Sequence, residues 1–501
     1  MGVLNKIKDS TAIFTTPKEP TFIQCSKTPW KSIYVTGAIS FLVVTQFAMF
    51  FSSMWPYLQT LDPEITEPFY GFIVGAYSVG SMGTATLFSK WSAKTRTVKE
   101  PIMACMAFMA VGNIIYLFVP LAPVPLRKWT MLFGRFILGF GDNSLALLQG
   151  YTSTASTPKD RSRAIAIMTG GLSVGFALAP ALQICFSPLG NGFQLLGNLR
   201  LNMYSAPSLA AIVACVVAFM LMKLVFVDEY AGISSKHEEK AGNLPPPDKL
   251  AIVLCCLGRY IQFFTFVNLE AIGAAYVETY FAQTKKFVVL FISGSHISCG
   301  VLSMFVYSCY IFFKLGKKVN ARFMLIISFV GFFLFYLITF QWPFLDDNIQ
   351  TYTENDLHSY LDGWVSEEPL GCNVDRYDWC TTMTLSNKWL YFAAFALFIG
   401  FGWPNINVCL GTVYSNIIGP RHQAYYQGIL QMCASGARLT GPIFMSSLYR
   451  AWGPRYVWGV ELVALSLQAA LLCIFYKRLV PLETEPERKQ TDVSQLEVPT
   501  E

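Results

Sequence analysis

The sequence predicts an all-α membrane protein with twelve transmembrane helices in two six-helix halves. Two observations predict this architecture: apolar runs long enough to cross a bilayer, and short motifs that recur half a chain apart. Of the 501 residues, 53% are hydrophobic and 14% are charged, whereas soluble domains carry about 25% charged residues. The composition therefore favours a membrane protein over a soluble one.

The chain contains twelve apolar runs, each near or above the roughly 20 residues that a helix needs to span a bilayer. The runs are 32–54, 69–89, 101–121, 129–150, 164–187, 204–226, 250–273, 287–313, 321–341, 388–416, 424–447 and 456–476. Several runs exceed the minimum length, which predicts tilted or kinked helices.

Three motifs occur twice at an offset of about 261 residues. They are Arg-x-x-Ala at 161–164 and 421–424, Gly-Phe-Gly at 139–141 and 400–402, and the prolines Pro180 and Pro442. A constant offset indicates duplicated halves. In membrane proteins duplicated halves are typical of transporters, whose site lies between two related bundles.

The basic residues predict that both termini are cytosolic. With that orientation, 25 of the 37 Lys and Arg residues fall in cytosolic segments and nine on the opposite side, as the positive-inside rule requires. Residues 1–31 hold five lysines and no apolar core, so we expect the first span, and not a cleavable signal peptide, to direct insertion. The net charge of +6 then reflects topology, and no nucleic-acid partner is expected.

These boundaries divide the chain into five segments, one of which carries a long loop. The segments are a cytosolic N-terminal segment 1–31, an N-terminal bundle 32–226, a cytosolic linker 227–249, a C-terminal bundle 250–480 with a non-cytosolic loop 342–387, and a cytosolic tail 481–501. The linker contains Pro245-Pro-Pro247 and a charged run, which is typical of a mobile connection.

The loop 342–387 contains Cys372 and Cys380, two of the 13 cysteines. Only these two lie on the side where disulfides persist, so we expect a bridge between them. The alternative is a pair of free thiols in a reducing or acidic lumen. No metal site and no cofactor are expected.

Two charged residues in the fourth span are candidate transport residues, because charges inside a membrane usually face a partner or a wet cavity. Arg135 lies in Gly134-Arg-Phe-Ile-Leu-Gly139 and is expected either to gate transport or to bond to loop carbonyls. Asp142 is expected either to bind a proton or cation or to neutralise a nearby arginine.

Three further candidates lie in the C-terminal half. Arg259 and Glu270 are eleven residues apart, about three helical turns, so they share a helix face without pairing and suggest a polar path. Glu270 is expected to sense the substrate or ion, or to lie solvated at the rim. Arg438 lies just before Gly441-Pro442 and is expected to meet an anion between the halves.

Arg135 with Gly139 and Gly141 resembles the fourth-span motif of the major facilitator superfamily, and Gly171, Gly175 and Pro180 resemble its fifth-span antiporter motif. A narrower resemblance is to the lysosomal family of this superfamily that is associated with type-seven neuronal ceroid lipofuscinosis. It rests on collinear segments from about residue 30 to residue 480, and Glu270 stands where that family has a seventh-span glutamate. The matching segments are 53–63, 99–101, 202–204, 371–372, 379–380, 435–442, 452–455 and 476–479.

The resemblance implies the major facilitator fold, a lysosomal or late endosomal membrane, and conductance of a small anion, chloride. Another endomembrane or the plasma membrane is the alternative location. Tyr230-Ala-Gly-Ile233 and Tyr476-Lys-Arg-Leu479 fit tyrosine-based sorting signals and suggest sorting adaptors as partners, besides membrane lipid.

Three function classes follow. Buried arginines favour a channel-like anion conductance, which is the preferred interpretation. Asp142, Glu270 and the repeated halves favour the alternative, alternating-access transport of a small organic solute coupled to protons. An intramembrane enzyme is not expected, because paired intramembrane aspartates and a His-x-x-x-His site are absent from the sequence.

Overall fold

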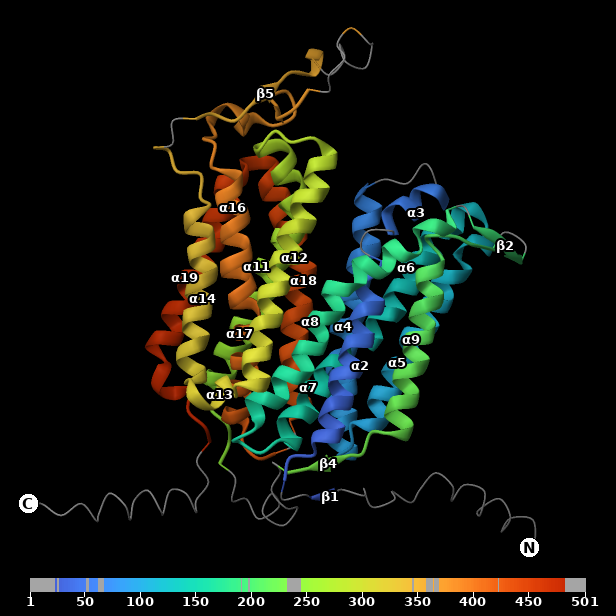
Figure 1. Ribbon diagram of the computed structural model, residues 1–501, viewed down its shortest axis with the longest axis vertical. Coiled ribbons are helices and arrows are strands. Elements are labelled where there is room, and N and C mark those ends of the chain that lie inside the picture. The colour runs from blue at the N-terminus through green and yellow to red at the C-terminus, as the bar shows by residue number, and fades with distance from the viewer. Residues whose placement is uncertain are drawn as a thin grey trace, which may run out of the picture.

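The structure is a computed structural model that describes residues 23–24, 27–50, 54–61, 67–190, 192–196, 199–231, 245–344, 347–356, 364, 369–421 and 423–482. The described chain forms two bundles of long helices (Figure 1). The fold class that the sequence predicts is confirmed, with a helix at each of the twelve apolar runs.

The N-terminal bundle consists of α2 (Trp30–Ala48), α3 (Met54–Leu61), α4 (Glu67–Thr95), α5 (Lys99–Phe118), α6 (Val124–Gly141), α7 (Asn143–Ala155), α8 (Arg161–Cys185) and α9 (Ala206–Leu224). The first apolar run, 32–54, extends past the end of α2. The fourth run is divided into α6 and α7, with Asp142 between them.

The C-terminal bundle consists of α11 (Lys249–Tyr280), α12 (Lys285–Phe312), α13 (Leu315–Lys318), α14 (Ala321–Ile338), α16 (Lys388–Ala394), α17 (Gly400–Ile418), α18 (Ala424–Trp452) and α19 (Pro454–Ile474). A π-helical turn, η5 (Phe395–Ile399), joins α16 to α17. The core of the C-terminal bundle is strongly aromatic and includes Phe329, Phe332 and Phe335, all fully buried.

Eleven helical segments of the described chain are long and apolar enough to cross a membrane. The remaining long helix is α18, which has 29 residues. It is less apolar because it places Gln431, Ser435 and Arg438 against the N-terminal bundle.

Three short strand pairs lie outside the helices. β1 (Ile23–Gln24) pairs with β4 (Glu229–Tyr230), and β2 (Phe193–Leu196) pairs with β3 (Leu199–Leu201). β5 (Thr351–Tyr352) pairs with β6 (Cys372–Asn373) over the C-terminal bundle. β4 and β5 lie at opposite ends of the molecule (Figure 1), and these ends are called the β4 end and the β5 end below.

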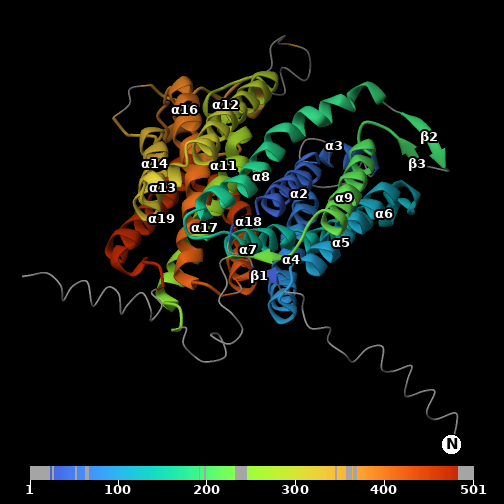
Figure 2. The same cartoon turned by 60° about the horizontal axis from the view of Figure 1, so that its bottom comes forward.

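The two bundles meet at the β4 end and diverge towards the β5 end (Figures 1 and 2). Polar contacts near the β4 end join α8 to α17: Arg161 donates to Asn416, and the hydroxyls of Ser162 and Thr412 lie 3.4 Å apart. In addition, Lys317 of α13 pairs with Asp160 at 2.9 Å.

Close helix packing positions α6 against α4. A Cβ atom on Gly139 would lie 2.2 Å from the carbonyl oxygen of Tyr77, and one on Gly80 would lie 2.3 Å from that of Phe136. Only glycine permits this approach of two backbones. The approach brings Asp142, which follows α6, beside the polar residues of α4.

Candidate transport site between the two bundles

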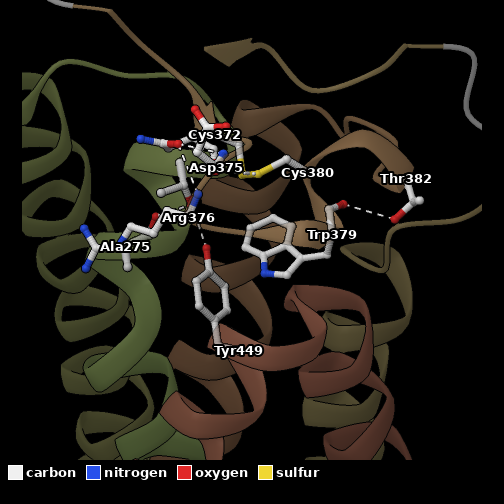
Figure 3. The surroundings of a disulfide bond; sticks show 10 residues. Ala275, Cys372, Asp375, Arg376, Trp379, Cys380, Thr382 and Tyr449 are labelled. Carbon is white, nitrogen blue, oxygen red and sulfur yellow. Dashed lines mark hydrogen bonds between the residues drawn. A yellow bond between two sulfur atoms is a disulfide. The ribbon is translucent and has the colours of Figure 1, made fainter. Parts of the chain in front are cut away.

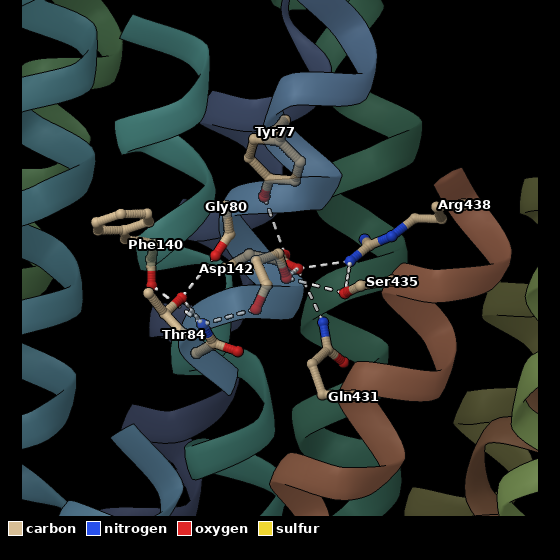
Figure 4. Close-up of polar contacts among 10 residues, drawn as sticks. Tyr77, Gly80, Thr84, Phe140, Asp142, Gln431, Ser435 and Arg438 are labelled. Carbon is tan, nitrogen blue, oxygen red and sulfur yellow. Dashed lines mark hydrogen bonds and ion pairs between the residues drawn. The ribbon is translucent and has the colours of Figure 1, made fainter. Parts of the chain in front are cut away.

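Asp142 is the centre of a polar cluster that joins the bundles (Figure 4). Its carboxylate is buried and accepts hydrogen bonds from Tyr77 Oη at 2.9 Å and Ser81 Oγ at 2.7 Å, both on α4. From α18 it accepts hydrogen bonds from Gln431 Nε2 at 2.9 Å and Arg438 Nη2 at 2.5 Å. A carboxylate with four donors, one of them a cation, is fully satisfied although it lies inside the protein.

Arg438 lies on the α18 side of the same cluster. Its Nη2 also donates to Ser435 Oγ at 3.0 Å, and the hydroxyls of Ser435 and Ser81 lie 2.9 Å apart. Asp142 therefore does neutralise an arginine, but the arginine comes from the other bundle and not from its own span. Arg438 lies between the halves, and its expected contact with an anion stays a prediction.

Arg259 is a second buried cation near Arg438. Its Nη1 donates to Gln262 Oε1 at 3.0 Å and Asn407 Oδ1 at 2.6 Å. Both guanidinium groups lie against the ring of Phe263, at 5.8 Å for Arg259 and 5.6 Å for Arg438. None of the ion pairs among the described residues includes Arg259.

Arg135 packs against aromatic rings of the N-terminal bundle. It is 3% exposed, and its guanidinium packs over the rings of Phe50 at 4.7 Å and Tyr116 at 5.8 Å. These rings belong to the N-terminal bundle, so Arg135 packs within its own half. The structure brings Asp142, Arg438 and Arg259 towards one region. Glu270 lies in α11, but its side chain is outside the described part, so the expected stripe with Arg259 stays a prediction.

Sequence reasoning missed Glu461 of α19, which is fully buried. It accepts hydrogen bonds from Thr265 Oγ1 at 2.8 Å and Asn268 Nδ2 at 2.6 Å, both on α11. The signal was present, since a single carboxylate in the apolar run 456–476 is as unusual as Asp142 in the fourth span.

The loop 342–387 packs on the C-terminal bundle. Cys372 and Cys380 form a disulfide bond (Figure 3), and Trp379 lies 5.4 Å from the ring of Tyr449 of α18. Tyr280 of α11 donates to the carbonyl of Thr384 at 2.6 Å. The described part of the loop thus covers its own bundle at the β5 end.

A sequence profile described as "Major Facilitator Superfamily" matches residues 36–353. The chain belongs to the major facilitator superfamily. The frog protein "Major facilitator superfamily domain-containing protein 8" (Xenopus laevis) is 30% identical over 484 residues, which is 92% of this chain and 94% of the frog protein. The resemblance that the sequence suggested is therefore confirmed at the level of the family.

Superfamily members of known structure share the fold at low sequence identity. The proton:xylose symporter XylE superposes with a TM-score of 0.65 at 13% identity, covering 90% of this chain and 97% of its own. The human organic anion transporter MFSD10 superposes with a TM-score of 0.59 at 14% identity, covering 88% and 99%. At this identity the two structures show the shared fold. The family match makes the chain a membrane transporter of the superfamily.

Proposed function

We propose that this protein moves a small solute by alternating access, with the Asp142–Arg438 pair as the contact that opens and closes between the bundles. The observation that carries the proposal is this pair, because it joins residues 296 positions apart at the interface of two repeated halves. In transporters of this type one bundle rocks against the other around a central site. Here such rocking requires the pair to separate.

The separated pair needs new partners, because a lone charge in the membrane interior is costly. An anionic group on the solute offers Arg438 a replacement for Asp142, and charge-assisted hydrogen bonds to a guanidinium are strong. Arg259 donates to the amide oxygens of Gln262 and Asn407. It adds a second positive charge near the ring of Phe263, against which Arg438 also lies. These observations support an anionic solute.

The test is uptake into proteoliposomes that contain the purified chain, with radiolabelled chloride and fluorescein as separate probes. Arg438→Gln and Glu270→Gln are expected to lower uptake at least tenfold while insertion stays normal. Arg450→Gln is the matched control, since Arg450 is an exposed residue of the same helix. Wild-type uptake in both Arg438→Gln and Glu270→Gln would reject the site.

Channel-like chloride conductance is the second candidate, and it rests on the family resemblance together with the buried arginines. Patch-clamp recording of enlarged endolysosomes that express the chain tests it. A current that disappears when chloride is replaced by a large impermeant anion supports the conductance. A current that persists unchanged rejects it.

A lysosomal or late endosomal membrane is the proposed location, on the same resemblance. Both tyrosine-based sorting motifs have a buried key residue: Tyr230 is 0% and Leu479 is 2% exposed. Adaptor binding would therefore require either segment to leave its place. Imaging of the tagged chain with lysosomal markers, with and without Tyr476→Ala, tests both the location and the signal.

A further inference from the structure

Glu461 is a buried carboxylate that the proposed site does not use. It lies seven residues after the start of α19, about 10 Å along the helix axis from the β5 end. Its two hydrogen-bond partners, Thr265 and Asn268, are 0% and 2% exposed. No ion pair among the described residues includes Glu461.

The ionisable side chains around Glu461 do not compensate a negative charge. Tyr276 of α11 and Tyr336 of α14 contact Trp458, three residues before Glu461, with ring centroids 4.6 and 5.6 Å apart. Three arginines on helices that carry or pack against Glu461, namely Arg259 of α11, Arg438 of α18 and Arg455 of α19, have partners of their own. The tyrosines are neutral near physiological pH. Arg438 pairs with Asp142, Arg259 bonds to amides, and Arg455 donates to the carbonyl of Gln341 at 3.1 Å.

The surroundings satisfy both protonation states of this carboxyl group. As a carboxylate, Glu461 accepts from the Thr265 hydroxyl and the Asn268 amide. As placed, Asn268 Oδ1 has no hydrogen-bond partner, and turning the amide over would present this oxygen to Glu461. A protonated Glu461 would then donate to it across the same 2.6 Å, a normal length for an O–H···O bond.

A water-sized cavity lies beside Asn268. A cavity of about 10 Å³, room for one water molecule, is lined by Asn268, Tyr336 and Trp458 among others. Val457, which also lines it, precedes Glu461 by one helical turn on α19. Water in the cavity would touch Asn268 directly.

Asn268 also touches the helix that carries Arg438. A Cβ atom on Gly441 of α18 would lie 2.9 Å from Asn268 Oδ1, and Gly441 is followed by Pro442, which lies inside the helix. A reorientation of Asn268 would therefore change its contact with α18 at Gly441, about one helical turn after Arg438.

We propose that Glu461 reversibly binds the proton that drives this transporter, and that Asn268 transmits its protonation state to α18. The inference rests on the proposed carrier function and deepens it by naming the coupled ion. No bond other than O–H is made or broken: the proton moves between water and a carboxylate oxygen of Glu461.

Infrared difference spectroscopy of the full chain in detergent, between acidic and alkaline buffer, tests the site. A protonated-carboxyl band that shifts in heavy water is expected in the wild type and is expected to be lost in Glu461→Gln. The control is Glu278→Gln, at a partly exposed residue of α11, which is expected to retain the band.

Thr265→Val removes a donor to the carboxylate and is expected to raise the titration midpoint of Glu461 by about one pH unit. An unchanged band in Glu461→Gln, or an unchanged midpoint in Thr265→Val, would overturn the site. Since no solute is needed, this failure is distinct from failure of the carrier function.

The coupling is tested by spin-label distances between the bundles. The labels are placed at Lys94→Cys and Lys314→Cys, two exposed positions on different bundles, with the exposed Cys185 and Cys473 changed to Ser. The wild-type distance distribution is expected to change with pH, and Glu461→Gln is expected to hold the acidic distribution throughout. An equal pH response in both proteins would overturn the coupling.

Discussion

At the residue scale, partners decide what a buried charge can do. Asp142 and Glu461 are both buried carboxylates, yet Asp142 accepts from a guanidinium and Glu461 only from a hydroxyl and an amide. A paired carboxylate keeps its charge, whereas an unpaired buried one is the easier group to protonate. The two residues therefore suit different tasks, contact between bundles for Asp142 and proton binding for Glu461.

The Asp142–Arg438 pair predicts a double-mutant cycle. Asp142→Asn and Arg438→Gln each leave the partner charge buried and unpaired, which costs about 3–5 kcal/mol for buried pairs. The double variant removes both charges and is expected to recover most of the lost stability. Thermal unfolding of the purified variants measures it. Additive losses in the double variant would show that the two residues act independently.

At the element scale, glycines set how closely α4 and α6 approach, and that approach brings Asp142 to Tyr77 and Ser81. The Gly-Phe-Gly motif at 139–141 thus has a packing role. It is followed by Asp142, whereas the corresponding motif at 400–402 is followed by Trp403 and Pro404.

The 400–402 segment follows a π-helical turn at the start of α17. Such turns are frequent at functional sites.

Gly139→Ala tests this packing. The added Cβ meets the Tyr77 carbonyl at 2.2 Å, so α4 and α6 must separate, with an expected loss of about 1–3 kcal/mol and reduced transport. Gly83→Ala on α4 is the control, because nothing lies within 4 Å of its added Cβ. Thermal unfolding and uptake are measured for both variants. Equal behaviour of the two would contradict the role of Gly139.

The bridge in the loop 342–387 gives a second prediction at this scale. Cys372 and Cys380 are eight residues apart, and closing a loop of that size stabilises a fold by about 2–3 kcal/mol. Mass spectrometry of non-reduced peptides is expected to find the linked pair. Cys372→Ser is expected to increase protease cleavage of the loop and leave the helices protected. Free thiols at both positions in the mature protein would refute the bridge.

At the scale of the whole molecule, the contacts at the β4 end hold the two bundles together. Partial burial raises the pKa of Asp160, but its hydrogen bond to Lys317 and the charge of Lys317 outweigh burial and lower it below the ordinary value. A carboxylate with a lowered pKa contributes stability above its unfolded pKa and loses it as the pH falls through the folded one. The Asp160–Lys317 contact is therefore expected to persist at about pH 4, the ordinary pKa of an aspartate, and to be lost only at lower pH.

Neutralising this contact is expected to favour separation of the bundles at the β4 end. Asp160→Asn and Lys317→Gln should each broaden the distance between labels at Lys94→Cys and Lys314→Cys towards longer values. The effect is modest because both groups are partly exposed, and pairs of this kind contribute up to about 1 kcal/mol. Lys318→Gln, an exposed lysine of the same short helix, should leave the distances unchanged. Identical distributions in all variants would show that the contact does not hold the bundles.

The sequence by itself determined the membrane class, the twelve helices and the duplicated halves, because span length, hydropathy and repeated motifs are local properties. It also identified Asp142 and Arg438, because a charge in an apolar run is visible without a structure. Tertiary structure alone decided that these two pair across the bundles, that Arg135 packs on Phe50 instead, and that Glu461 meets Asn268. Those facts depend on which helix faces which, a choice fixed by backbone approach at glycines and by packing of residues hundreds of positions apart.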